Sequence, residues 1–387
     1  MDAALPRSAS ARRGATGARG TLLHCIPGMG GGGAERQLAY LAAPLVARGW
    51  NLHVALVAGG PNLARLQHSG ATIHRLTSGG SHDPRLVWQL TRLLRRLKPD
   101  LVQAWFVQME ILAGGAASLA RVPWILSERS SRLAHPPTLK NRLRLLAARR
   151  AAAIVSNSRG GDEYWAQRMD ARVRRFIVPN ALPFDEIDRV QPEVPAELPV
   201  RPDQALVLSF GRIDREKNIE RVFDACRRVV QRADTVAVLC GEGALRPAIL
   251  RQIAENGLSE RVFAPGYITR IWGLVKRADV IVAAGTFEGR PNAVLEAMAA
   301  SRPLVVSDIP AHREILDHSS ALWVDPENPA AIAAAIEQVL DDPAAAERRS
   351  AIARSRAAVW SIGAAADEYD RIYRTVLSGN GTASARP

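Results

Sequence analysis

The chain has 387 residues, enough for two domains of ordinary size, and 47% of them are hydrophobic, which suffices for buried cores. The longest apolar stretch, residues 111–126, is broken by Arg121 and Pro123, so no membrane-spanning helix is predicted. Residues 1–20 are rich in Arg, Ala, Ser and Gly without an apolar core. This composition excludes a secretory signal and predicts a disordered basic extension, with an organellar transit peptide as the alternative.

The excess positive charge lies in the first half. Residues 1–190 hold 27 Lys and Arg against 12 Asp and Glu, a net of +15, whereas residues 191–387 hold 24 against 26, a net of −2. A basic half without a spanning helix favours an anionic partner, such as a membrane leaflet, a lipid diphosphate or a nucleic acid. A generally Arg-rich composition is the alternative, but it would not confine the excess to one half.

The first predicted strand, residues 21–26, leads into a glycine-rich loop with Gly30, Gly31, Gly32 and Gly33. Three glycines, at 28, 30 and 33, spell the dinucleotide fingerprint G-x-G-x-x-G. That fingerprint also needs an acidic residue after the second strand, residues 51–60, yet none occurs between Glu35 and Asp83. We therefore expect these glycines to let the backbone approach a phosphate or an acceptor, and a purely structural turn stays open.

Two later strands of the first half end in polar or aromatic residues. Residues 100–106 form a buried strand with Trp105 and Gln108 at its carboxyl end, where Trp105 either stacks on a sugar or packs in the core. The strand that starts at residue 122 ends at Glu128 and Arg129. Glu128 is a candidate for contacting an acceptor, and its alternatives are a surface pair with Arg129 or simple solvation.

Residues 139–150, LKNRLRLLAARR, form a basic amphipathic helix. Such a helix can lie on an anionic bilayer. The alternative is a surface helix that packs its leucines inward. The three cysteines, Cys25, Cys226 and Cys240, lie in apolar stretches without metal-ligand spacing and are predicted to be core residues of a reducing compartment.

Residues 191–203 hold four prolines and predict a linker between domains. The strand beyond it runs into a loop with Arg212 and Lys217, two cations suited to a diphosphate leaving group. No Asp-x-Asp follows a strand, so no metal is expected. The alternative for Arg212 is a surface ion pair with Asp214 or Glu216.

Residues 279–318 predict a buried strand, a loop, a short helix and a second buried strand. Pro291 and Asn292 mark the helix start, with Pro in the first turn and Asn as a cap. Glu288 lies in the loop, and Glu296 lies inside the helix, where its carboxylate could hold a ribose diol. The helix N-terminus favours a phosphate. The alternative is that both glutamates are solvated charges near a helix start.

The segment EGRPNAVLEAMAASRPLVVSDIPAHREI, from Glu288 to Ile315, closely resembles the nucleotide-binding signature of retaining family-4 glycosyltransferases. FGRIDREKN, residues 210–218, is similar to their G-R-x-x-x-x-K motif. The resemblance spans about residues 21–362 and is strongest in the second half. Many members have histidines where this chain has Gln103 and Trp105, so a histidine-assisted role is in doubt here.

The resemblance implies an α/β chain of GT-B fold, in which two doubly wound Rossmann-like domains face each other across a cleft. Its expected parts are a basic extension (1–20), an acceptor-binding domain (21–190), a linker (191–203), a nucleotide-sugar domain (204–362), a helix crossing back to the first domain (363–378) and a frayed tail (379–387).

The residue patterns and the resemblance together give three sets of candidate site residues. The catalytic set is Arg212, Lys217 and Glu288. The donor-binding set is Gly211, Gly241, Glu242, Gly289, Arg290, Pro291, Asn292, Ala293, Val294 and Glu296. The acceptor or cleft set is Gly30, Gly31, Gly32, Gly33, Trp105, Gln108, Glu128 and Arg129.

The implied activity is transfer of a hexose or N-acetylhexosamine, with retention, from a nucleotide diphosphate sugar, UDP first, to a hydroxyl acceptor. The basic half favours a polyprenyl-diphosphate-linked acceptor and an anionic membrane, hence a cytoplasmic enzyme on the inner membrane face that makes cell-surface polysaccharide. No cofactor, metal or nucleic acid is expected. The rivals are an NAD-dependent oxidoreductase, a nucleotide-sugar epimerase of GT-B fold, and a non-catalytic nucleotide-sugar or nucleic-acid binding module.

Overall fold

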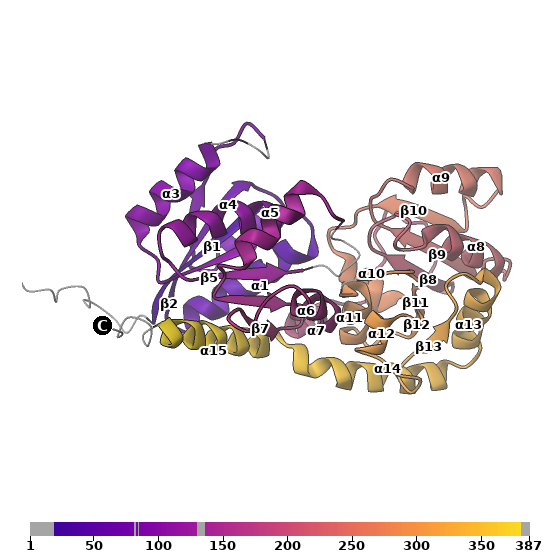
Figure 1. Cartoon of the computed structure of the whole chain (residues 1–387). Coiled ribbons are helices and arrows are strands. Elements are labelled where there is room, and N and C mark those ends of the chain that lie inside the picture. Colours follow the sequence, from indigo (N-terminus) through magenta and orange to yellow (C-terminus); the bar gives the residue numbers. More distant parts are fainter. Residues whose placement is uncertain (1–18, 81–82, 84, 130–135, 289, 381–387) are drawn as a thin grey trace, which may run out of the picture. The chain divides into compact units, whose positions relative to one another are not determined.

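A computed structural model describes residues 19–80, 83, 85–129, 136–288 and 290–380. Within these ranges the strands form two sheets, of seven and six strands (Figure 1). Contacts divide the chain into two compact units, one of Met1–Leu126, Arg150–Ala152 and Tyr373–Pro387 and one of Ser127–Arg149 and Ala153–Ile372. No helix among the described residues is long and apolar enough to cross a membrane.

The first sheet has the strand order β3-β2-β1-β4-β5-β6-β7. β1 pairs in parallel with both β2 and β4, so the order reverses direction between β1 and β4. Its strands are β1 (Gly20–Gly28), β2 (Trp50–Ala58), β3 (Thr72–Arg75), β4 (Leu101–Trp105), β5 (Trp124–Glu128), β6 (Ala153–Ser156) and β7 (Arg174–Ile177). The accompanying helices are α1 (Gly33–Ala47), α2 (Leu63–Gln67), α3 (Arg85–Leu97), α4 (Phe106–Leu119), α5 (Leu139–Ala148), α6 (Arg159–Ala166) and α7 (Phe184–Arg189).

The second sheet has the order β10-β9-β8-β11-β12-β13, with the reversal between β8 and β11. Its strands are β8 (Ala205–Phe210), β9 (Thr235–Cys240), β10 (Val262–Gly266), β11 (Val280–Ala283), β12 (Leu304–Ser307) and β13 (Leu322–Val324). The helices are α8 (Ile219–Val229), α9 (Arg246–Glu255), α10 (Ile271–Arg277), α11 (Asn292–Ala299), α12 (Pro310–Arg313), α13 (Pro329–Asp341), α14 (Pro343–Ala357) and α15 (Ile362–Asn380), with a 3-10 turn, η2 (Ala358–Trp360), before the last.

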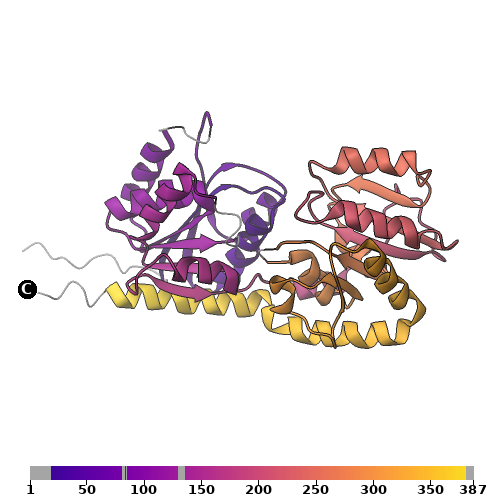
Figure 2. The same cartoon turned by 45° about the vertical axis from the view of Figure 1, so that its right-hand side comes forward.

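The second sheet is covered on both faces. Along β8, Leu206 and Leu208 belong to one hydrophobic cluster and Val207 to another. Helices α8 and α13 pack together over the Val207 face, and α11 and α14 pack together over the opposite face (Figure 2). Continuous apolar strands such as β8 are the ones expected in a parallel sheet with helices on both faces.

The Ala-rich stretch after β13 forms two helices and not one. The chain breaks between α13 and α14 at Asp342, because Pro343 has no N–H to continue the helix. The Asp342 carboxylate accepts a hydrogen bond from the backbone N–H of Ala345 at 2.9 Å, which caps the new helix.

The three cysteines are buried and free, as predicted. Burial raises the pKa of the Cys25, Cys226 and Cys240 thiols to about 12. At neutral pH these thiols are protonated and unreactive core groups.

Helix α5 is attached to its surroundings through a buried ion pair. The Arg144 guanidinium lies 3.0 Å from a carboxylate oxygen of Glu128, and the two side chains are 3% and 1% exposed. The indole N–H of Trp165 donates to the same Glu128 oxygen at 2.9 Å, and the guanidinium lies 4.9 Å from the Trp165 ring centroid. Glu128 is thus neither solvated nor paired at the surface with Arg129, and both of those readings are wrong.

This ion pair sets how α5 is rotated about its axis. Arg144 and Ala148 face inward, whereas Leu139, Leu143 and Leu146 are exposed. The reading in which α5 packs these leucines inward is therefore wrong. The buried charge, which cannot be left without its partner, occupies the inward side instead.

Replacing Glu128 with Ala is expected to destabilise the protein by about 3–5 kcal/mol, because the Arg144 guanidinium would stay buried without its counter-ion. Urea denaturation of both proteins measures the difference. Glu163→Ala, an exposed change on α6, is the matched control and should stay within about 0.5 kcal/mol of the parent. Equal stability of the two variants would contradict the structural role of Glu128.

A buried histidine supports the end of β12. The Nδ1–H of His312 donates to the Ser307 carbonyl at 2.8 Å, and the Ser307 hydroxyl donates to the Gly285 carbonyl at 2.5 Å. Burial lowers the pKa of His312 from 6.5 to about 4, so the folded protein holds a neutral imidazole at pH 7.

Because this pKa is lowered on folding, His312 contributes stability that is present above pH 6.5 and is lost as the pH falls towards about 4. We expect the free energy of unfolding to fall more steeply across this window in the parent than in His312→Asn. The asparagine keeps a donor for the Ser307 carbonyl but does not titrate. Urea denaturation at several pH values measures both slopes, and identical slopes would show that His312 does not titrate in this window.

Candidate active site

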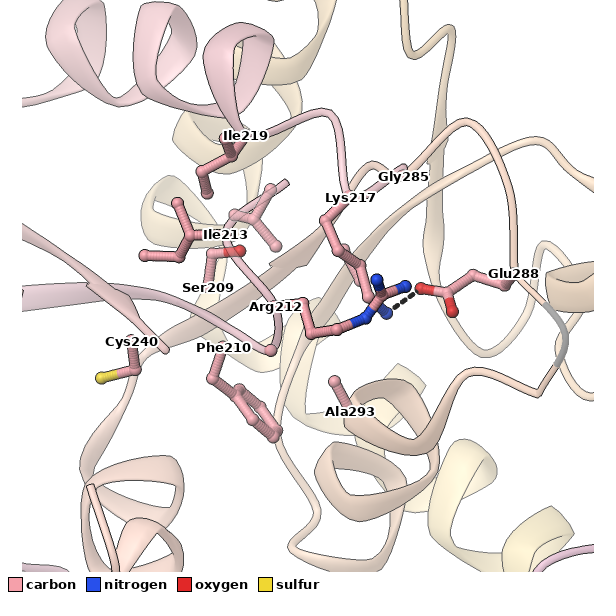
Figure 3. A pocket seen from close by; sticks show the side chains of 13 residues that line it. Ser209, Phe210, Arg212, Ile213, Lys217, Ile219, Cys240, Gly285, Glu288 and Ala293 are labelled. Atoms are coloured by element: carbon pink, nitrogen blue, oxygen red, sulfur yellow. Dashed lines mark hydrogen bonds and ion pairs between the residues drawn. The ribbon is translucent and has the colours of Figure 1, made fainter. Parts of the chain in front are cut away.

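The reversal of strand order in the second sheet creates a place for a ligand. Loops that leave the carboxyl ends of β8 and β11 diverge there, which is where ligands bind in open parallel sheets. A pocket lies at this position (Figure 3). Its lining includes five predicted site residues, Gly211, Arg212, Lys217, Glu288 and Ala293. All of them belong to the second compact unit.

The pocket also has lining residues that sequence reasoning missed. Most of them lie at the carboxyl ends of β8, β9 and β11 or immediately after them. Ligands of parallel sheets bind at such strand ends, so this position could have identified these residues from the sequence. They are Ser209, Phe210, Ile213, Ile219, Cys240, Val282, Ala283 and Gly285.

Two loops meet backbone to backbone beside the pocket. The Gly211 N–H donates to the Cys240 carbonyl at 3.0 Å. Gly241 has φ +139, and a Cβ atom there would lie 1.7 Å from the Gly211 carbonyl oxygen. Only glycine fits this contact, which holds the loops after β8 and β9 together.

Lys217 and Glu288 form the ion pair of the pocket, through Nζ and Oε1. Their side chains are 21% and 11% exposed, so the pair is partly shielded from water. Figure 3 shows the side chains of Arg212 and Lys217 both directed towards Glu288. The loops after β8 and β11 thus bring two cations and one carboxylate to one point.

The backbone around Lys217 is held on both sides. Its N–H donates to the Asp214 carboxylate at 3.0 Å. The next residue, Asn218, adopts a left-handed conformation with φ +55, which asparagine tolerates better than most residues. The Asn218 amide donates to the carbonyls of Ala284 at 3.0 Å and Pro326 at 2.7 Å, and so fastens this loop to the end of β11.

Arg212 forms the surface ion pairs with Asp214 and Glu216 that the sequence offered as an alternative to diphosphate binding. Its guanidinium lies 2.6 Å from Asp214 and 2.5 Å from Glu216, and its side chain is 65% exposed. Exposed pairs of this kind contribute little stability, so they can yield to a stronger anion.

Glu296 lies inside α11 and is 6% exposed, so simple solvation does not describe it. The indole N–H of Trp272, on α10, donates to its carboxylate at 3.3 Å. The helix begins at Asn292 after Pro291, and in the described part of the chain the helix start has no side-chain cap. The prediction of Asn292 as the cap is wrong, since it is the first helical residue.

Arg290 lies beside this helix start with a buried guanidinium, 5% exposed, 3.8 Å from Glu314. The guanidinium lies 4.8 Å from the Trp360 ring centroid. Burial lowers its pKa to about 10, and Nε and one Nη lack a hydrogen-bond partner among the described residues.

The other residues predicted to bind the donor have different environments. Val294 is in the hydrophobic core, and Glu242 is exposed with its carboxylate 4.0 Å from Arg246. Gly289 lies outside the described residues.

The glycine loop of the first sheet stands at the reversal between β1 and β4. A Cβ atom on Gly32 would lie 2.5 Å from a carboxylate oxygen of Glu35, and one on Gly30 would lie 3.2 Å from the other. The Asn62 amide donates to the Gly30 carbonyl. Gly33 begins α1, and Gly31 is exposed between them.

The remaining predicted acceptor residues vary in exposure. Trp105 is fully buried and its indole N–H donates to His24 at 3.4 Å, so it packs in the core. Gln108 is half-buried on α4. Arg129 donates to the Asn180 amide oxygen at 3.2 Å and to the Tyr369 hydroxyl at 2.6 Å.

Across the described ranges, no group of three or more His, Cys, Asp or Glu side chains could hold a metal ion. The charges that converge on the pocket come from Arg212, Lys217 and Glu288. Such a site can hold an anion through its cations, while the carboxylate accepts hydrogen bonds from hydroxyl groups.

Residues 190–356 match the family of glycosyl transferases group 1, and residues 32–181 match the glycosyl transferase 4-like domain. The alpha-D-kanosaminyltransferase of Streptomyces kanamyceticus is 31% identical over 276 residues, covering 66% of this chain and 71% of that protein. The lipopolysaccharide core biosynthesis glycosyltransferase LpsD of Rhizobium meliloti is 26% identical over 333 residues, covering 83% and 88%.

Among solved structures, Anabaena HepE in complex with UDP and glucose has the same fold, with a TM-score of 0.79 and 17% identity over 92% of this chain and all of that one. The two parallel sheets and this likeness establish the GT-B fold expected from the sequence. The chain therefore belongs to the glycosyl transferases of group 1 and is an enzyme that transfers sugars.

Proposed function

We propose that this enzyme transfers a hexose or N-acetylhexosamine, with retention of configuration, from a UDP-sugar to a hydroxyl of a lipid-linked saccharide. The observation that carries the proposal is the ion pair of Lys217 and Glu288 in the pocket at the reversal of the second sheet. In this proposal the cation binds the diphosphate, and the carboxylate accepts hydrogen bonds from the hydroxyls of the sugar.

The choice of UDP is supported by a structural relative. HepE was solved with UDP and glucose, and its fold matches nearly the whole of this chain. In our proposal Glu296 holds the ribose diol, with its carboxylate oriented by the Trp272 indole. The start of α11 then faces the diphosphate, where a helix N-terminus favours negative charge.

Lys217 and Arg212 neutralise the charge that develops on the departing diphosphate. Glu288, which pairs with Lys217, accepts hydrogen bonds from the sugar hydroxyls of the donor in this proposal. We propose that these cations suffice without a metal ion.

Retention follows if the acceptor hydroxyl attacks from the face that the diphosphate leaves. The bond from the anomeric carbon to the diphosphate oxygen breaks, the bond to the acceptor oxygen forms, and the acceptor proton passes to the diphosphate. Glu288 supports the positive charge on the sugar at this stage. Exclusion of water from the site would limit hydrolysis of the donor.

The acceptor is proposed from charge and from a relative. The first half of the chain carries a net charge of +15, which suits an anionic surface or a lipid diphosphate. LpsD, similar over most of its length, acts in lipopolysaccharide core biosynthesis. We place this enzyme on the cytoplasmic face of a membrane, in the synthesis of a cell-surface saccharide on a polyprenyl diphosphate carrier.

Lys217→Ala should lower kcat by about 100- to 1,000-fold, because one preorganised donor to the leaving group is lost. Release of the nucleoside diphosphate from the donor, measured under saturating donor and acceptor, gives this value. Arg215→Ala removes an exposed cation from the same loop and is the control, with activity close to that of the parent. Near-normal turnover by Lys217→Ala would refute its proposed role.

A thermal-shift panel with UDP, GDP, ADP, dTDP and NAD, without added metal, should give a shift with one nucleoside diphosphate. At about 100 times the dissociation constant, the ligand stabilises the fold by about 2.7 kcal/mol. Glu296→Ala should lose this shift, whereas Glu255→Ala, an exposed change on α9, should keep it. A shift with NAD alone would overturn the proposal, and interconversion of UDP-sugars without an acceptor would favour an epimerase.

A further inference from the structure

Helix α5 carries an apolar stripe that faces water. Leu139, Leu143 and Leu146 are 72%, 46% and 52% exposed. Their spacing of four and three residues places them on one face of the helix. A surface helix of a globular protein normally turns such a stripe towards the core, so this one is reversed.

The orientation of α5, with its leucines outward, is fixed by the buried face on the other side of the helix. Arg144 and Ala148 are buried there, and the Arg144 guanidinium is tied to Glu128 at 3.0 Å. Rotating α5 to bury the leucines would pull this charge from its counter-ion. The exposed stripe is therefore a stable feature of α5.

Exposed cations flank the stripe. Lys140 and Arg142 lie near its beginning and Arg149 and Arg150 near its end, all exposed. No Asp or Glu occurs between Glu128 and Asp162 in the sequence. The exposed side chains that α5 itself presents are therefore apolar or basic.

We propose that α5 is the element that docks this enzyme on an anionic lipid bilayer. The leucine side chains enter the boundary between headgroups and acyl chains, about 5–10 Å deep, and the flanking cations pair with lipid phosphates. The proposal rests on the proposed function, since a lipid-linked acceptor requires the enzyme at the membrane.

The charge pattern selects this occupant over a second copy of the chain. In a two-fold dimer through the leucines, each α5 would face the other, and the two sets of cations would be brought together. A bilayer with anionic headgroups supplies the opposite charge instead. Its interior also receives leucines without demanding the shape complementarity that a protein partner needs.

Flotation with vesicles of phosphatidylcholine alone and with 30 mol% phosphatidylglycerol tests the proposal. We expect the parent to float with the anionic vesicles and Leu143→Ser/Leu146→Ser to lose at least tenfold in binding. Leu119→Ser, at an 88% exposed leucine at the end of α4, is the matched control and should float like the parent. Arg142→Glu should weaken binding to anionic vesicles.

A label on Leu143→Cys locates the contact. The native thiols are buried, so a polarity-sensitive dye reacts at residue 143, and its emission should shift to the blue with anionic vesicles. Each variant is also tested for its nucleotide-induced thermal shift, which reports the donor site separately. A retained nucleotide shift without flotation, or flotation unchanged by the leucine substitutions, would overturn the docking proposal alone. A dimer in solution that the leucine substitutions dissolve would assign the stripe to a second copy.

Discussion

The candidate site depends on one electrostatic interaction, an ion pair between a cation and a carboxylate that come from two different loops. The two loops lie side by side where the strand order of the second sheet reverses. Lys217 follows β8 and Glu288 follows β11, and these strands are neighbours only because the strand order reverses there. Asn218 anchors one loop to the other. The two loops thus hold their charges as a pair, and pairing keeps either partly buried charge from being left without a counter-ion.

The strands of the second sheet and the loops that carry Lys217 and Glu288 were predictable from the local sequence. The apolar runs of β8, β9, β11 and β12 are buried strands because both faces of the sheet are covered, and a covered parallel strand needs no polar alternation. The motifs around Lys217 and Glu288 lie in loops that directly follow such strands. Their meeting at one pocket follows from the order of the strands, which the resemblance implied and spacing alone did not.

What escaped prediction depends on partners distant in sequence. Glu128 reads as an exposed carboxylate after a strand, but Arg144 and Trp165 enclose it. From the sequence, Trp105 could equally stack on a sugar or pack in the core, and only its hydrogen bond to the distant His24 decides between the two. The orientation of α5 has the same origin, since the periodicity of its leucines cannot reveal that its inward position is held by a charged residue. The residues after β4 and β5 were accordingly harder to predict than those after β8 and β11.

The contact between Gly211 and Gly241 has a consequence for how this enzyme could change its substrate. Beside the pocket, main chain packs against main chain, with no room for a methyl group at position 241. Variation during evolution, or in a randomised library, cannot alter selectivity there by exchanging side chains. Changes in what the pocket binds are instead expected at side-chain positions such as Phe210, Ile213 and Ala293, which line the pocket beside this contact. These three are the natural first choice for directed diversification.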